Sequence, residues 1–256
     1  MAAALPQPAR AVQESGPSEA ARQAGIPYMR ALETAAAAFA NRQFDQALQK
    51  LDEADEIQQN IPDTWDMRGA IYAEQHDFDK ARDAFQKAAK LDPRDFWPPY
   101  NLAQLLLMQR KYAEAAAEFK ALVPYKGHEE LVRFKIVFAD LLAGKADDAR
   151  VVLDAMKFPS DSPAYYFAHA SWSFSHKNQK DGFYWIQSAV KIFGDRECYS
   201  YYNALAGEGW VAPRLADGSI PTKQDLNSLP TLQDSDQPAA SPGSIAPAGP
   251  LTPRGL

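Results

Sequence analysis

The side chains that could bind a metal ion are few. His76, His128, His169 and His176 are the four histidines, and Cys198 is the one cysteine. His169 and His176 are seven residues apart and would share one face of a helix. No third ligand follows at a spacing typical of zinc sites. The sequence therefore predicts no metal and no cofactor, and a single cysteine permits no intrachain disulfide.

Motifs typical of enzymes are equally sparse. The acidic pairs at 129–130 and 147–148 stand where helices are predicted to begin, and the helix dipole favours carboxylates there. The Gly-Glu-Gly sequence at 207–209 lacks the third glycine and the preceding strand of a phosphate-binding loop. No local pattern resembles an activated serine or cysteine nucleophile. We therefore predict that the protein has no catalytic residues and is not an enzyme.

The charge of the chain argues against nucleic acid or an anionic membrane as its partner. The formal net charge is −6, whereas both of those surfaces attract basic proteins. No apolar run approaches the roughly 18 residues of a membrane-spanning helix, and the N-terminus lacks the charged and apolar regions of a signal peptide. We expect a cytoplasmic protein. The alternative is an exported or periplasmic protein whose signal peptide is missing from this chain.

The most informative feature is a repeat of 34 residues. Four sets of residues return at this step: Phe44, Phe78 and Tyr112; Ala47, Ala81, Ala115 and Ala149; Leu51, Phe85, Phe119 and Leu153; Ala54, Ala88, Leu122 and Met156. Self-similarity of this kind is typical of a stack of similar supersecondary units rather than of one globular core.

Each unit is predicted to be two helices joined by a short turn. Apolar residues from Trp65 to Tyr72 fall on one helical face, and a second apolar face follows over residues 78–88. Pro62 suits the first turn of the leading helix, and Asp77 suits the N-cap of the second. Gly69 is small where the two antiparallel helices must approach closely.

These positions resemble the tetratricopeptide-repeat (TPR) family. The matching residues are Trp65, Gly69, Tyr72, Ala81, Phe85, Ala88 and Pro93, and Arg68 replaces the usual leucine. The resemblance implies an all-α fold: a right-handed α-solenoid of about five TPR helix pairs plus a terminal capping helix, eleven helices in all. In the fourth repeat the predicted helix over 130–143 fits with either Val137 or Ala139 at the small position. The fifth repeat is one residue shorter.

The two ends of the chain differ in composition from the repeats. Residues 1–26 are rich in Ala, Pro, Gln and Ser, and residues 209–256 are rich in proline and poor in large apolar side chains. Such segments bury too little apolar area to offset the entropy of ordering. We expect a disordered N-terminal segment over 1–26, a TPR solenoid over 27–208, and a disordered Pro-rich tail over 209–256.

The TPR resemblance also implies where a partner would bind, because the leading helices of TPR proteins line a concave groove. The predicted groove residues are Trp97, Tyr100, Asn101, Gln104 and Met108 of the third repeat and Asp63, Asp66 and Met67 of the second. We expect the two amides to hydrogen-bond an extended peptide and the apolar residues to hold its side chains. Because Asp66 stands where TPRs that bind acidic C-terminal peptides carry lysine, an apolar or basic segment is the expected ligand.

Two alternatives remain open for the aromatic residues. Trp97 and Tyr100 would be buried if they pack against the next leading helix instead of lining the groove. Aromatic residues are also dense between Tyr165 and Trp210, and Tyr184, Trp185 and Tyr201 are candidates for a second interface. The alternative for this second set is that the terminal helix and the chain after it cover the aromatic rings.

The sequence thus favours a non-catalytic protein-protein interaction adaptor, a scaffold or assembly factor that binds a protein or peptide partner in the concave TPR groove. The alternative is a TPR chaperone that shelters an apolar segment of a client protein. Suppression of client aggregation would distinguish the chaperone from the adaptor.

Overall fold

The structure, a computed structural model, describes residues 17–215 and 217–221. Within these ranges the chain is entirely helical. The helices are α2 (Glu19–Gln23), α3 (Gly25–Ala40), α4 (Phe44–Ile57), α5 (Pro62–Glu74), α6 (Phe78–Leu91), α7 (Trp97–Met108), α8 (Tyr112–Ala121), α9 (Glu129–Leu142), α10 (Ala146–Asp154), α11 (Pro163–Ser175), α12 (Gln179–Phe193) and α13 (Asp195–Gly207).

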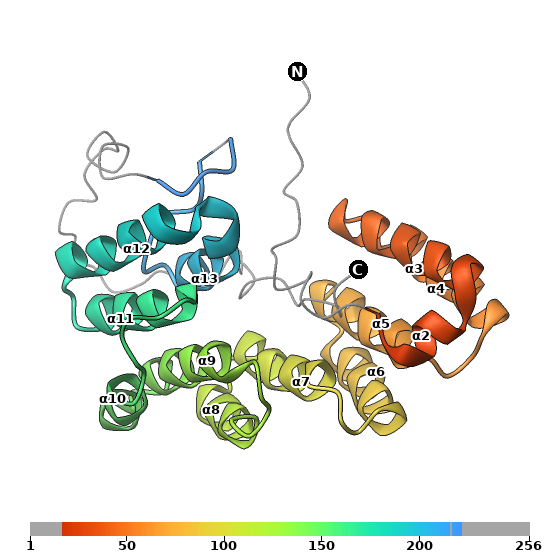
Figure 1. Ribbon diagram of the computed structural model, residues 1–256, viewed down its shortest axis with the longest axis horizontal. Coiled ribbons are helices and arrows are strands. Elements are labelled where there is room, and N and C mark those ends of the chain that lie inside the picture. Colours follow the sequence, from red (N-terminus) through yellow and green to blue (C-terminus); the bar gives the residue numbers. More distant parts are fainter. Residues whose placement is uncertain (1–16, 216, 222–256) are drawn as a thin grey trace.

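The helices form five successive antiparallel pairs, from α3/α4 to α11/α12, and α13 follows the last pair. The pairs are stacked in an arc (Figure 1). Along the middle of the arc the leading helices α5, α7 and α9 lie on the inside, and α6, α8 and α10 lie on the outside. The predicted all-α solenoid is therefore confirmed, with each of the eleven predicted helices present and α2 as an additional one.

Each pair is joined by the same turn, which determines the repeat register. One residue per turn has a positive φ: Arg42, His76, Arg110, Gly144 and Lys177. The residue after it donates its N–H to a carbonyl five residues earlier, as from Asp77 to Tyr72 at 2.9 Å. Gly69 precedes His76 by seven residues, and Val137 precedes Gly144 by the same seven. The small position of the fourth repeat is therefore occupied by Val137, not by Ala139.

Gly69 is required by the close contact of α5 with α6. A Cβ at this position would lie 2.5 Å from Cε1 of Phe85, well inside van der Waals contact. Phe85 itself is fully buried. In the third repeat Ala103 takes the same position opposite Phe119, so the repeats differ in how closely their two helices approach.

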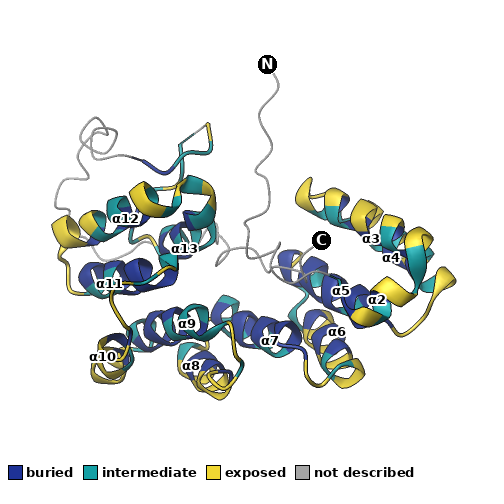
Figure 2. Cartoon of the chain, viewed as in Figure 1, coloured by how far each residue is buried: buried dark blue, intermediate teal, exposed yellow. Residues whose placement is uncertain are grey.

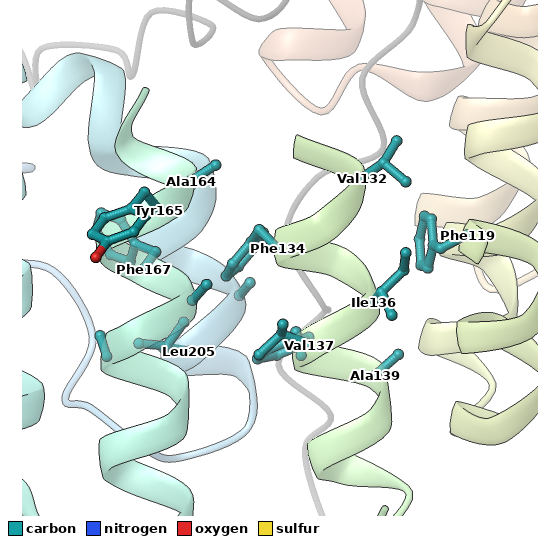
Figure 3. Packing of buried hydrophobic residues seen from close by; sticks show 14 of the residues in the cluster. Phe119, Val132, Phe134, Ile136, Val137, Ala139, Ala164, Tyr165, Phe167 and Leu205 are labelled. Atoms are coloured by element: carbon teal, nitrogen blue, oxygen red, sulfur yellow. The ribbon is translucent and has the colours of Figure 1, made fainter. Parts of the chain in front are cut away.

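The core is continuous along the stack, because each leading helix packs on both sides. On α9, Phe134 and Val137 point toward α11 and α13, whereas Ile136 and Ala139 point toward Phe119 of α8 (Figure 3). All five of these side chains are buried. Burial is correspondingly concentrated on α5, α7, α9 and α11, while α3, α6, α8, α10 and α12 expose their outer faces (Figure 2).

The N-terminal boundary was predicted wrongly. Residues 17–26, expected to be disordered, include the helix α2 and the start of α3. The Ser18 hydroxyl accepts a hydrogen bond from the N–H of Ala21 at 3.0 Å, and the Ser18 N–H donates to Asp63 at 3.0 Å. Ala21 is fully buried. One cap and one tertiary hydrogen bond thus stabilise a helix too short to form alone. Residues 1–16 lie outside the described residues.

The C-terminal boundary was also placed too early. Val211 and Ile220 are buried against the solenoid. The Tyr202 hydroxyl donates to the Ala212 carbonyl at 2.8 Å, and the Gln187 side-chain amide donates to the Pro221 carbonyl at 3.1 Å. Residues 209–215 and 217–221 therefore belong to the folded domain, because their few apolar side chains find a surface that composition alone does not reveal. The rest of the predicted tail lies outside the described residues.

We expect Gly69→Ala to lower the free energy of unfolding by about 1–3 kcal/mol, because the added Cβ overpacks the contact with Phe85. The measurement is urea denaturation followed by circular dichroism. Adding Phe85→Leu should recover part of the loss by making room for the methyl group. A Gly69→Ala variant as stable as the parent would show that the two helices separate without cost.

Candidate binding surface on the inside of the solenoid

We use the term inner face for the sides of α5, α7, α9 and α11 that correspond to the predicted groove. The repeat step of 34 residues, 33 into the fifth repeat, transfers each position from one leading helix to the next. Asn101 of α7, for example, corresponds to Met67 of α5 and to Lys135 of α9. The inner face can therefore be built residue by residue from the register found above.

Most of the predicted groove residues are buried. Less than a tenth of the residue is exposed for Asp63, Asp66, Met67, Trp97, Tyr100, Asn101 and Gln104. Met108 is half-buried. These side chains are parts of the floor and the core of the inner face, not of an open aromatic surface.

Trp97 and Tyr100 are held by other aromatic rings. Trp97 lies edge-on to Phe96 with ring centres 5.1 Å apart, and it packs against His128 before α9 at 5.4 Å. Tyr100 contacts Phe119 of α8 at 5.5 Å. The alternative in which these rings pack against the following repeat therefore describes the structure better than the predicted contact with a partner. Burial also raises the pKa of the Tyr100 hydroxyl well above its usual value.

The predicted polar residues of the second and third repeats contact one another or the N-terminal helix. The Asn101 amide nitrogen donates to Asp66 across the α5–α7 interface at 3.0 Å. Asp63 accepts the N–H of Ser18. The amide nitrogen of Asn101, expected to hydrogen-bond a peptide, thus joins two repeats instead.

Two inner-face oxygens have no hydrogen-bond donor among the described residues. One is Oε1 of Gln104 on α7 and the other is Oε1 of Glu74 at the end of α5, and both atoms are buried. The other oxygen of Glu74 pairs with Arg42 at 3.2 Å. Buried polar atoms without partners are uncommon in folded proteins, so each of them requires a physical explanation.

Lys135 is an inner-face residue that the sequence analysis missed. It lies on α9 and is 6% exposed. Its ammonium nitrogen is 5.5 Å from the centre of the Phe134 ring, and no carboxylate of the described chain pairs with it. Desolvation by burial lowers the pKa of the Lys135 amine to about 7. The repeat register was the signal that could have found it, because Lys135 follows the predicted groove residue Asn101 by 34 residues.

The terminal helix covers the inner face of the last repeats. Tyr201 of α13 contacts Phe134 of α9 at 5.1 Å and Phe167 of α11 at 5.4 Å. Trp210, just after α13, contacts Phe138 at 5.3 Å. The helix was expected to cap the end of the stack, and it instead lies against the inner side of α9 and α11. The inner face that remains comprises α5, α7 and the near side of α9.

The proposed second interface is split by this arrangement. Tyr184 is 65% exposed on α12, and Trp185 stacks on His169 of α11 with ring centres 4.6 Å apart. Tyr201 belongs to the inner face and does not join them. The sequence could not separate these residues, because their helices are consecutive but face different sides of the stack.

No cluster of three or more residues able to hold a metal ion occurs in the part of the chain that the structure describes. None of the helices in that part is long and apolar enough to cross a membrane. Burial raises the pKa of the Cys198 thiol to about 12, which leaves it a weak nucleophile at neutral pH.

Comparisons with known proteins agree with the geometry. The tetratricopeptide-repeat family pattern matches residues 62–95, the second helix pair. A thermophilic TPR protein of Thermus thermophilus superposes with a TM-score of 0.55 and 14% identity, over 65% of this chain and 91% of that one. PilF of Pseudomonas aeruginosa gives 0.53 and 14%, over 78% and 96%. PilW, described as a widely conserved type IV pilus biogenesis factor, gives 0.52 and 16%, over 72% and 94%. The comparison with curated proteins gives no match.

The repeating turns, the small-to-large contacts between paired helices and the family match define one class of protein. The chain belongs to the tetratricopeptide-repeat proteins.

We expect Lys135→Met to raise the free energy of unfolding at pH 7 by about 1–4 kcal/mol, because a buried amine without a counter-charge gives way to an apolar side chain of similar length. The pKa of this amine falls from 10.5 to about 7 on folding. Between these two pH values the unfolded chain binds the proton more tightly, so the stability of the parent protein should rise with pH.

The measurement is urea denaturation at a series of pH values from 6 to about 10.5. The variant should lose the part of the rise that belongs to Lys135. Lys90→Met, at an exposed position on α6, is the matched control and should change little. A Lys135→Met variant that is less stable than the parent at pH 7 would contradict the assignment of a desolvated amine.

Proposed function

We propose that this TPR protein is a non-catalytic adaptor or assembly factor that binds a segment of a partner protein along the inner face of α5, α7 and α9. The observation that carries the proposal is the set of buried polar groups that the described chain leaves without hydrogen bonds on this face. They are Oε1 of Glu74 and Oε1 of Gln104, and the amine of Lys135 has no carboxylate partner there. A bound segment with polar main-chain groups would supply what these atoms lack.

The position of α13 supports the same surface. With Tyr201 and Trp210 against Phe134, Phe138 and Phe167, the inner side of the last repeats is already covered by the chain itself. A partner would then bind the part of the inner face that lies toward the N-terminus. That part is acidic on α5, where Asp63, Asp66 and Glu74 lie, and this favours a segment with basic or apolar residues over α5.

An assembly role is in keeping with the comparison proteins. PilW, which shares the fold, is described as a type IV pilus biogenesis factor. The likeness concerns the fold, and a fold supports many functions. The proposal for this chain therefore rests on its own inner face, and the partner has to be identified by experiment.

We expect a photo-crosslinking amino acid at Met108 to capture the partner in cells of the source organism, because this half-buried residue ends α7 on the inner face. The same amino acid at Gln86, exposed on the outer side of α6, is the control and should not capture it. The products are identified by mass spectrometry.

A third variant carries the crosslinker at Tyr184 on α12. A product from Tyr184 or Gln86 with none from Met108 would contradict binding at the inner face and would place the interaction on the outer surface. Trp97 and Tyr100 are unsuitable for this test, because their substitution would damage the aromatic core around Phe96.

A further inference from the structure

Lys135 and Gln104 lie close to each other on the inner face. The Asn101–Asp66 hydrogen bond joins residues 35 positions apart on successive leading helices. The same step from Lys135 leads to Tyr100, and Gln104 follows Tyr100 by one helical turn on the same side of α7. The two polar side chains therefore meet at the α7–α9 junction, next to the part of the inner face that α13 covers.

The two side chains have complementary hydrogen-bonding needs. Lys135 carries three N–H donors and Gln104 presents an acceptor oxygen. Each residue is 6% exposed. Oε1 of Gln104 has no donor among the described residues, and Lys135 contacts the ring of Phe134 rather than a carboxylate. Burying such groups without partners is unfavourable, so a ligand that satisfies both is strongly preferred over water-excluded contact with an apolar one.

We propose that Lys135 and Gln104 form one binding point for an acidic side chain of an extended partner segment. The carboxylate of an internal Asp or Glu pairs with the Lys135 amine, and a main-chain N–H of the same segment donates to Oε1 of Gln104. This inference rests on the proposed function, because it needs the partner to lie on the inner face.

The neighbouring residues favour an internal side chain over a terminal carboxylate. The amide nitrogen of Asn101, which could have helped to bind a carboxylate, donates to Asp66 instead. The carboxylate of Asp66 on α5 would repel a second, closely held negative charge on that side. One amine and one amide oxygen match one acidic side chain and one main-chain N–H.

The test is a selection of random twelve-residue peptides against the immobilised full chain. The library is displayed in two formats, one with the peptide inside a carrier protein and one with a free C-terminus. We expect the internal format to yield binders with Asp or Glu at one shared position. A synthetic binder with blocked ends should bind the parent protein at least about tenfold more tightly than its version with Glu replaced by Gln.

The variants make the assignment specific to this site. Against Lys135→Met the Glu and Gln peptides should differ by less than about twofold, and a new selection against Lys135→Glu should favour Lys or Arg at that position. Lys90→Met, at an exposed outer position, is the control and should behave like the parent. Circular dichroism and thermal melting establish that each variant is folded.

The outcomes separate this inference from the proposed function. Peptides that bind and compete with crosslinking at Met108, but show no acidic preference, would overturn the inference and leave inner-face binding in place. Enrichment only in the free C-terminal format would also overturn it, in favour of a terminal carboxylate. A folded protein that selects no peptide in either format would overturn both.

Discussion

The close approach of the two helices in each pair is the constraint on which the rest of the structure depends. Phe85 fills the space that Gly69 leaves, at a distance that no side chain at position 69 could share. A pair packed in this way still has apolar surface on both sides, so it must stack on its neighbours. Stacking then brings leading helices into a constant step, and Asn101 can reach Asp66 across that step.

The inner face combines this regular step with side chains that do not stabilise it. Glu74, Gln104 and Lys135 each place a polar group where water is largely excluded. Apolar residues at these positions would pack with less loss of hydration, as the aromatic residues of α9 and α11 do. Polar residues retained at such positions are readily understood if their contribution is to binding, and this explains why the same face carries both proposals.

The terminal helix breaks the symmetry of the solenoid. A sixth pair would have continued the arc, whereas α13 turns inward and sets Tyr201 between Phe134 and Phe167. The hydrogen bond from Tyr112 to Glu208, 3.2 Å long, links its end to the start of α8. The chain itself therefore limits how far a partner can extend along the inner face, and the remaining surface is bounded by α5 at one side and α9 at the other.

The sequence alone determined the helix pairs, their period and the family, because these depend on local spacing that repeats five times. It could not decide which groove positions stay accessible, since the burial of Trp97 depends on His128 in the next repeat. Nor could it assign Lys135, whose significance lies in the carboxylate that no described neighbour provides. The ends of the domain were misjudged for the same reason: Ser18 and Val211 are ordered by distant surfaces, and only the tertiary structure brings those surfaces to them.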